Sequence, residues 1–301
     1  MTNITNTPVS GYAASETFSE DIVSNLCDFS LFLTVMKHRE AYQNTLSLIL
    51  EEPDIQIREV KVEQVVLNKS GKRAIRLDAW ALSEDERQFD MEMQNDSDQD
   101  SLPKRARFYQ GLMDAPILKS GKRTKYRQLP STTIIFITQD DIFRRDRAKY
   151  IFTERCEEFD DLKLEDGTTK IFLNMTSKNG SKELVSLLQY MRKTDINNPE
   201  IEVKDKRLLE LNNIVSEVKE SEEWEAVKMD ILDVGILRGI NQGEFKKLIA
   251  QVNRKKAKNI TASEIADILE EDPTLVQQIY DALDQYDAET EWSKILPLLH
   301  H

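Results

Sequence analysis

Residues 132–138 read TTIIFIT, a nearly continuous run of β-branched and aromatic residues. Such a run is typical of a strand buried on both faces, because a strand with one solvent-exposed face alternates apolar and polar side chains. A strand of this kind needs helices on both sides of its sheet. We therefore expect an α/β fold, in which a mixed sheet is flanked by helices.

The segments around this run supply the other elements of the expected fold. Val60, Val62 and Val65 alternate with other residues, mostly charged, which is the pattern of a strand with one apolar face. The predicted strands lie at 57–67, 74–82, 88–94 and 169–175, and the first three form an antiparallel meander. Apolar residues at spacings of three and four, with helix-start residues, predict one or two helices within 20–51 and further helices at 101–118 and 181–192.

The last third of the chain contains no segment that predicts a strand. Helices are predicted there at 203–220, 222–241, 243–258, 262–271 and 273–288. Because the segment from Asp195 to Pro199 has the composition of a linker, we place a domain boundary there. The expected parts are a disordered tail at 1–19, an α/β domain at 20–195 and an all-α module at 196–301.

Charge is distributed unevenly along the chain. The whole sequence carries a net charge of −13, yet residues 101–150 hold 12 Lys or Arg against 4 Asp or Glu, a net charge of +8. Phe108, Tyr109 and Tyr126 lie between these basic residues. Such a segment suits a phosphate backbone, where cations displace condensed counterions. The alternative is a solvated basic surface that pairs with acidic parts of the same protein.

Several classes of protein are excluded by composition. No apolar run approaches the ~20 residues of a membrane span, and the N-terminus lacks the regions of a secretory signal. Cys27 and Cys156 are too few and too far apart for a disulfide framework or a zinc site, and they fit a reducing cytoplasm. Apart from two histidines at the C-terminal end, His38 is the only histidine, so a histidine-based triad or metal site is not expected.

Acidic residues on neighbouring strands are the candidates for catalytic chemistry. Alternation places Asp90, Glu92 and Gln94 on one face of the third predicted strand and Asp78 on one face of the second. If these strands pair, Asp78 comes close to Glu92. Two adjacent carboxylates resist joint ionisation unless a cation lies between them, and Mg²⁺ is bound by one or two carboxylates together with waters and phosphate oxygens. The alternative is an amphipathic strand with a solvated acidic face.

The order of these elements resembles a known group of nucleases. An opening helix, a strand with Asp78, a strand with Glu92-x-Gln94 and a helix rich in arginine resemble the PD-(D/E)XK nuclease superfamily. More narrowly, they resemble the Rpn family of recombination-promoting nucleases, which are also described as transposase-like. The resemblance covers about residues 28–143. Its motifs are Asp28-Phe29 with Phe32 and Val35-Met36, Arg76-Leu77-Asp78, Asp90 to Gln94, Lys104 to Gln110, Gly121 to Leu129, and Ile134 to Ile137 with Asp141.

This resemblance implies a metal-dependent DNA endonuclease with a restriction-endonuclease-like fold. Asp78 and Glu92 would bind Mg²⁺ or Mn²⁺, with the backbone carbonyl of Met93 as a third ligand, and Gln94 would complete the catalytic set. Gln94 stands where the superfamily usually has lysine. An amide can orient the attacking water by hydrogen bonding, but it lacks the positive charge of an ammonium group. Leu77 replaces the proline of the superfamily's name.

The helix after the acidic strands is the predicted DNA-binding element. Its candidate contacts are Lys104, Arg105, Arg107 and Tyr109, and we expect Arg105 or Arg107 to face the scissile phosphate. The alternative for the arginines is a salt bridge with the acidic strands. The alternative for Tyr109 is a half-buried position in the core rather than stacking on a base.

The C-terminal helices carry two features that bear on assembly. Gly235, Gly239 and Gly243 recur every four residues, so they share one side of a helix and let another helix approach closely. This spacing predicts a homo-oligomer through the C-terminal helices, and the alternative is a flexible, poorly formed helix. The segment 261–273 and the helix after it have the outline of a helix-turn-helix, but their acidity favours an ordinary helical hairpin.

These observations leave hypotheses from different classes. The first is a cytoplasmic Mg²⁺-dependent DNA endonuclease that hydrolyses phosphodiester bonds in recombination, transposition or defence against foreign DNA. The second is a catalytically weak nuclease-fold module that binds DNA or protein, in which Gln94 marks the loss of activity. A further hypothesis is that the helical module regulates the nuclease. No membrane partner is expected.

Overall fold

The structure is a computed structural model that describes residues 24–66, 72–95, 101–118, 125–288 and 290–295, with the backbone alone at 232–242 and at Ser293. The chain divides into two compact units, Met1–Glu225 and Ala226–His301. Among the described residues, no helix combines the length and the apolar character that crossing a membrane requires.

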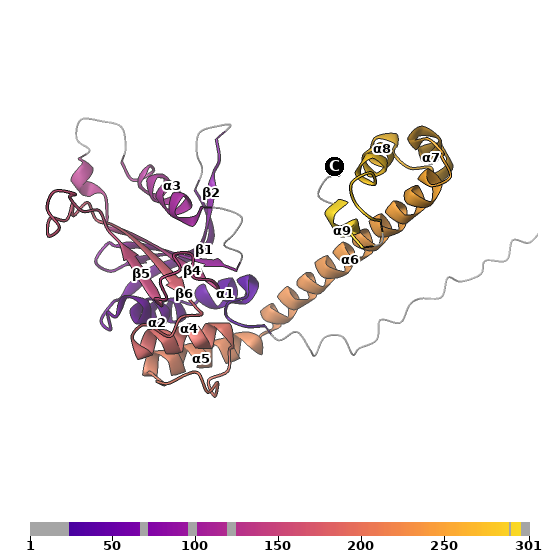
Figure 1. The fold of residues 1–301 in the computed structure, drawn as a ribbon. Helices are drawn as coiled ribbons and strands as arrows, with labels where there is room; N and C mark the ends of the chain where they lie inside the picture. Colours follow the sequence, from indigo (N-terminus) through magenta and orange to yellow (C-terminus); the bar gives the residue numbers. More distant parts are fainter. Residues whose placement is uncertain (1–23, 67–71, 96–100, 119–124, 289, 296–301) are drawn as a thin grey trace, which may run out of the picture. The chain divides into compact units, whose positions relative to one another are not determined.

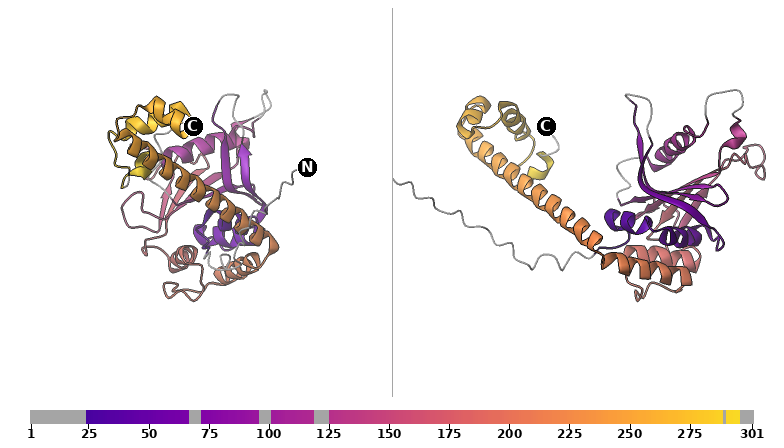
Figure 2. Two further views of the ribbon diagram at one scale, coloured as in Figure 1. Left: turned by 90° about the vertical axis from the view of Figure 1, so that its right-hand side faces the viewer. Right: turned by 180° about the vertical axis from the view of Figure 1, so that it is seen from behind.

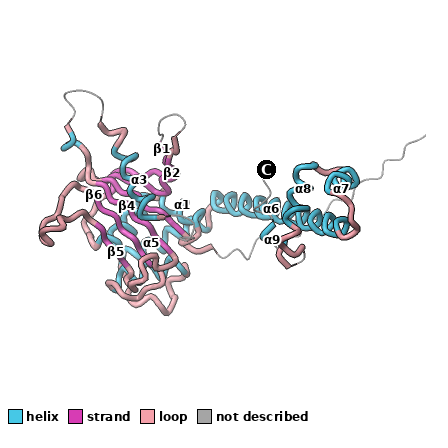
Figure 3. Tube along the Cα trace, turned by 45° about the horizontal axis from the view of Figure 1, so that its top comes forward, coloured by secondary structure: helices cyan, strands magenta, loops and turns pink. Residues whose placement is uncertain are grey.

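The first unit is built on a six-stranded mixed sheet with the strand order β1-β2-β3-β4-β6-β5 (Figures 1 and 3). Its strands are β1 (Ile57–Val66), β2 (Ile75–Ser83), β3 (Gln88–Gln94), β4 (Thr132–Thr138), β5 (Lys149–Phe152) and β6 (Thr168–Asn174). The predicted meander is confirmed, because β1, β2 and β3 pair antiparallel. β3, β4 and β6 run parallel, and β5 pairs antiparallel with β6.

Helices cover both faces of this sheet, as the buried central strand predicts. Figure 1 shows α3 on one face and α1, α2, α4 and α5 on the other, and Figure 2 shows the same layers from behind. These helices are α1 (Phe29–Met36), α2 (Arg39–Leu50), α3 (Leu102–Asp114), α4 (Lys182–Arg192) and α5 (Lys206–Lys219), with the short 3₁₀ helix η1 (Tyr126–Gln128). The mixed α/β class is therefore confirmed.

The side chains of β4 explain why this strand lies at the centre. Ile134 and Phe136 point toward α3 and pack in a cluster with Tyr109, while Ile135 and Ile137 alternate to the opposite face and are fully buried. Burial of both faces removes apolar surface from water at about 25 cal/mol per Å². The apolar run at 132–138 thus forms the core of the unit.

Two features of this unit differ from the sequence-based expectation. β5 was not predicted, because a four-residue edge strand is too short to show an alternating pattern. The unit also extends past residue 195 to Glu225, since α5 packs on α2 and buries Leu208, Leu211 and Val215. The Asp195–Pro199 segment connects elements within one unit.

The second unit is entirely helical in the part that the structure describes. It contains most of α6 (Glu222–Lys256), with α7 (Ala262–Leu269), α8 (Pro273–Ala282) and α9 (Trp292–Ile295). Its core includes Ile249, Val252, Ile265, Val276 and Ile279. α7 begins with a capping box in which the Thr261 and Glu264 side chains each accept a bond from the other's backbone N–H.

The glycine repeat lies inside one continuous helix, whereas the sequence predicted two helices with a break near residue 242. The side-chain surroundings of Gly235 and Gly239 lie outside the described residues. A Cβ placed on Gly243 would meet nothing within 4 Å, so no close packing is shown there. Assembly through these helices stays a prediction.

Candidate functional site

Asp78 on β2 and Glu92 on β3 meet where the backbone pairing of these strands ends. The register pairs Ala79 with Met91, so the next step along both strands brings Asp78 opposite Glu92. At this position side-chain carboxylates accept the backbone N–H groups in place of backbone carbonyls. The Asp78 N–H donates to Glu92 Oε1 at 2.9 Å, and the Met93 N–H donates to Asp78 Oδ2 at 3.2 Å. Both acids are buried, with 6% and 0% of their surface exposed. The structure therefore brings the two predicted acids together.

The same geometry fixes the direction of the Met93 backbone. The N–H and C=O groups of one strand residue point to the same side of the strand. Because the Met93 N–H reaches Asp78, the Met93 carbonyl also faces β2, next to the two acids. The Met93 carbonyl, predicted as a third oxygen ligand, therefore lies on the same side of β3 as Asp78.

Arg105 of α3 lies across the face of this site and links its polar groups. Its Nη2 donates to Glu92 Oε2 in a salt bridge, and its Nη1 donates to Gln94 Oε1 at 2.8 Å. Its Nε donates to the hydroxyl of Tyr109 at 2.8 Å. The guanidinium also lies over the rings of Tyr109 and Phe136, at 5.0 and 5.3 Å from their centroids. Of the two alternatives for Arg105, the structure shows the salt bridge.

Tyr109 lies in the core, which is the alternative to stacking on a base. Its ring is 8% exposed and packs in the cluster between α3 and the sheet. Burial, followed by the charge of Glu92, raises the pKa of its hydroxyl to about 12, so it stays neutral and accepts the Arg105 bond. Tyr109 anchors Arg105 and is not placed to stack on a base.

Burial dominates the electrostatics of the two acids. It raises the pKa of Asp78 to about 6, although the Met93 N–H and then Arg105 act in the opposite direction. Burial and the charge of Asp78 raise the pKa of Glu92 to about 8, and Arg105 again opposes this shift. A single guanidinium therefore does not compensate for the removal of both carboxylates from water.

Asp90 is a third carboxyl group at this place, to which the sequence assigned no role. It is fully buried, and neither of its oxygens accepts a bond from a backbone, hydroxyl, amide or guanidinium donor among the described residues. Burial, and then the charges of Glu92 and Asp78, raise its pKa well above the ordinary value. The neutral, protonated form of Asp90 is favoured.

The donor set fits a hard divalent cation. Asp78 and Glu92 offer carboxylate oxygens and Met93 offers a carbonyl oxygen, which are the ligands that Mg²⁺ and Mn²⁺ prefer. Among the described residues, no three His, Cys, Asp or Glu side chains are grouped so that they could hold a metal ion. A set of two carboxylates and one carbonyl is consistent with that finding, since Mg²⁺ usually keeps several waters.

Exposed basic residues lie on α3 and on the loop after β4, which both follow strands that end at this end of the sheet. Lys104 and Arg107 are exposed on the first turns of α3, which follows β3 in the chain. The loop after β4 begins beside Gln94, because Gln94 pairs with Thr138, and it carries the exposed Arg144. In the part of the chain that the structure describes, Lys104, Arg107 and Arg144 form no ion pair.

Not all of the basic segment lies there. Lys125 directly precedes η1 and Arg127 lies within it. Since η1 precedes β4, both residues lie toward the opposite end of the strands. Lys149 binds Glu51 at 3.0 Å. Lys119, Lys122 and Arg123 lie outside the described residues. The net charge of +8 in the sequence is therefore divided between different surfaces of the unit.

Asp141 organises the basic loop, and sequence reasoning missed this role. Its two carboxylate oxygens accept bonds from the backbone N–H groups of residues 143–146 and from the Tyr150 hydroxyl, all between 2.7 and 3.0 Å. These bonds hold Arg144 and Asp146 in left-handed conformations, with φ of 55° and 51°. Although burial acts against it, the Tyr150 and backbone bonds lower the pKa of Asp141. No composition signal could have shown this local arrangement.

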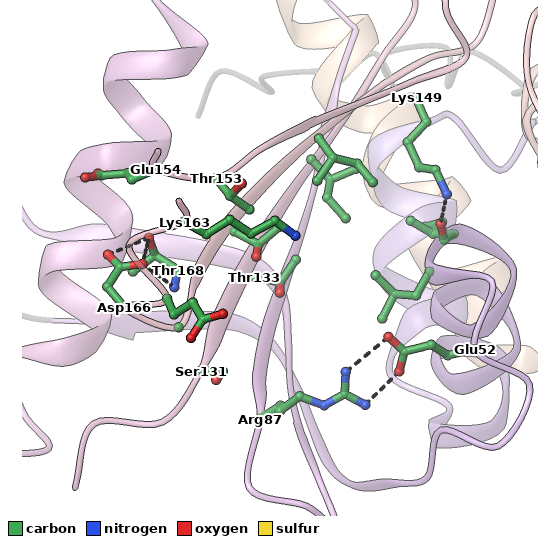
Figure 4. Close-up of a pocket in the computed structure, with 17 residues that line it drawn as sticks. Glu52, Arg87, Ser131, Thr133, Lys149, Thr153, Glu154, Lys163, Asp166 and Thr168 are labelled. Carbon is green, nitrogen blue, oxygen red and sulfur yellow. Dashed lines mark hydrogen bonds and ion pairs between the residues drawn. The ribbon is translucent and has the colours of Figure 1, made fainter. Parts of the chain in front are cut away.

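A separate pocket of about 360 Å³ lies on the other face of the sheet, at the end where β4 and β6 begin. Thr133 and Ile171 line it, and their positions alternate with those of the residues that contact α3. Figure 4 shows Lys163 pointing into this pocket, while Arg87 and Glu52 pair at its edge. None of the predicted site residues lines it.

No protein-family model, no curated protein and no solved structure matches this chain.

Proposed function

We propose that this protein is a metal-dependent nuclease of the PD-(D/E)XK type that hydrolyses phosphodiester bonds in DNA. The observation that carries the proposal is the buried pair of Asp78 and Glu92, which are bonded to each other's strands at the point where backbone pairing stops. The resemblance of residues 28–143 to the Rpn family supports the same proposal.

In this mechanism the chain holds the cation and positions the groups around it. Asp78, Glu92 and the Met93 carbonyl are the ligands. When bound, the ion acidifies a water and stabilises the charge that develops on the phosphodiester. Gln94 orients the attacking water through its side-chain amide, and it supplies no charge of its own.

The basic residues around this end of the sheet would bind the DNA backbone. Lys104, Arg107 and Arg144 are exposed and form no ion pair among the described residues, so their charges are available for phosphates. Contacts of this kind give affinity and orientation rather than sequence specificity. We therefore expect binding that weakens steeply with salt and depends little on sequence.

Cleavage of supercoiled plasmid DNA with Mg²⁺ or Mn²⁺ tests the proposal. We expect Asp78→Ala to lower the rate by ~100-fold or more, since a metal ligand contributes several kcal/mol of transition-state stabilisation. The matched control is Glu84→Ala, which removes an exposed acid from the turn between the same two strands. Equal cleavage by the wild type and Asp78→Ala at matched purity would remove the acid pair from the mechanism.

A second candidate is a nuclease-fold module that binds DNA without cutting it. The specific observation in its favour is that Arg105 already binds Glu92 and Gln94, so a cation is present at the acids without any metal. Calorimetric titration with Mn²⁺ separates the candidates. Binding that disappears in Glu92→Gln supports the nuclease. DNA binding that needs no divalent ion, together with no Glu92-dependent Mn²⁺ site, supports the module.

A further inference from the structure

We propose that Arg105 is a positioning residue that exchanges partners: it binds Glu92 and Gln94 in the metal-free protein and moves to a DNA phosphate when a divalent cation binds. This inference rests on the proposed function and concerns the regulation of the same site. Its consequence is that metal and DNA bind cooperatively, each strengthening the other.

Arg105 and a metal ion need the same oxygen atoms. Glu92 Oε1 accepts the Asp78 N–H and Glu92 Oε2 accepts from Arg105, so both oxygens have partners in this structure. The Gln94 oxygen is also bonded to Arg105. A cation that takes Glu92 as a ligand therefore has to share the carboxylate with a fixed positive charge or displace it. Two cations on one buried carboxylate repel each other strongly.

The Arg105 guanidinium is held by side-chain contacts alone, so it can leave Glu92 by changing its own rotamer. Its three donor nitrogens are fixed by Glu92, Gln94 and Tyr109, and it rests on two aromatic rings. Its side chain is nevertheless 24% exposed, so part of the side chain reaches solvent. A change of rotamer moves the guanidinium away from Glu92 without moving α3, which the packing of Ala106 and other buried residues holds on the sheet.

The released guanidinium would bind a phosphate of the DNA backbone. Lys104 and Arg107 flank Arg105 in sequence on α3, and both are exposed without an ion pair among the described residues. Adjacent helix positions do not share a face, so Arg105 would meet a backbone phosphate other than those nearest Lys104 and Arg107, and a phosphate accepts a planar, bidentate guanidinium well. Without DNA the metal has to displace Arg105 into water, and with DNA the displaced Arg105 gains a phosphate. The difference is a coupling free energy, and by linkage DNA binding raises metal affinity by the same factor.

Calorimetric Mn²⁺ titration of the full-length chain tests the competition, at pH 8.5 so that protons compete less for the acids. We expect Arg105→Gln to bind Mn²⁺ about 10-fold more tightly than the wild type in the absence of DNA. Tyr109→Phe keeps every charge and removes the oxygen that accepts from Arg105 Nε, and we expect a smaller gain in the same direction. Arg107→Gln is the matched control, because it removes an exposed charge that does not contact Glu92.

Fluorescence anisotropy with a labelled duplex tests the cooperativity. Ca²⁺ takes the same kind of oxygen ligands and is compared with EDTA. We expect Ca²⁺ to raise the DNA affinity of the wild type by roughly 5- to 150-fold, the usual range of such couplings, and to raise that of Arg105→Gln by clearly less. Arg107→Gln should bind DNA more weakly and keep the full effect of Ca²⁺.

The outcomes separate this inference from the proposed function. A Glu92-dependent Mn²⁺ site in the wild type that is no tighter in Arg105→Gln or in Tyr109→Phe overturns the exchange and leaves the nuclease proposal intact. Absence of a Glu92-dependent site in all variants overturns both. If Arg105→Gln unfolds without metal, Mn²⁺ should restore its melting transition more than it stabilises the wild type. No such restoration would count against the exchange.

Discussion

Glu92→Gln tests which of two opposing effects controls the charge of the site. Burial and the charge of Asp78 raise the pKa of Glu92, whereas Arg105 and the Asp78 N–H lower it. The resulting pKa of about 8 means that burial dominates. The folded protein then keeps a proton on Glu92 that the unfolded chain releases near its ordinary value of 4.5. Glutamine has nearly the same shape and carries no proton that titrates.

The sign and size of the effect follow from proton linkage. Between about pH 5 and 8 the folded state binds more protons than the unfolded state, so the free energy of unfolding falls as the pH rises. One such proton corresponds to about 1.4 kcal/mol per pH unit. We expect the slope in Glu92→Gln to be shallower by about that amount.

Urea denaturation in EDTA at pH 5.5, 6.5, 7.5 and 8.5 measures this slope. Replacing Trp224 and Trp292 by Phe in every variant leaves Trp80 on β2 as the only tryptophan, so its fluorescence reports the unit that holds the site. Glu84→Gln, an exposed acid in the next turn, should keep the wild-type slope. Parallel slopes for the wild type and Glu92→Gln would show that Glu92 is ionised throughout this range, and that the Arg105 salt bridge dominates over burial.

Three further predictions concern the surroundings of the site. Asp141→Asn should weaken DNA binding several-fold without changing Mn²⁺ affinity, because its amide cannot accept all the N–H groups that shape the basic loop; anisotropy and calorimetry check the two parts. Replacing both Arg144 and Arg145 by Gln should lower the slope of log affinity against log salt by ~0.9 for each phosphate that these arginines neutralise. Gly180→Ala should destabilise the protein by about 1–3 kcal/mol in urea, since its Cβ would lie 2.8 Å from a neighbouring side-chain carbon. Its control, Gly111→Ala in α3, meets nothing within 4 Å and should be stabilising or neutral.

The part of the fold that could be predicted is the part governed by local patterns. In β1 to β3 apolar and polar residues alternate because one face of each strand is more buried than the other, and β4 is apolar throughout because both of its faces are buried. The order of residues in the sequence therefore predicts these strands directly. The short connection between β2 and β3 then limits their register, which is why Asp78 and Glu92 could be placed together from the sequence.

The part that could not be predicted depends on partners distant in the sequence. α5 belongs to the first unit because α2 offers it an apolar face, and no feature of residues 206–219 alone indicates that choice. α6 continues through Gly239 and Gly243, although each glycine costs a helix about 1 kcal/mol. Because each glycine destabilises the helix by so little, the glycines near residue 242 are weak evidence for a helix boundary there.

Within the site, the contacts of Arg105 likewise depend on residues that are distant in the sequence. Its sequence position allowed either a phosphate contact or a salt bridge, and only the orientation of α3 on the sheet decides between them in the free protein. The sequence indicates Asp141 only as part of a motif, because its contacts involve backbone groups in left-handed conformations that residue type does not reveal. Geometry of this kind is available only from a structure.

Stability alone gives a poor account of the three carboxyl groups at the site. Asp78, Asp90 and Glu92 are all buried, and burial raises the pKa of each, so each makes the folded state less stable as the pH rises toward neutrality. Apolar residues of similar volume would pack against Phe136 at no such cost. Groups that are costly to fold cluster where a charged ligand later compensates for them. One guanidinium does not balance three carboxyl groups, whereas under the proposed function a divalent cation held by Asp78 and Glu92 would stabilise the ionised forms of those two.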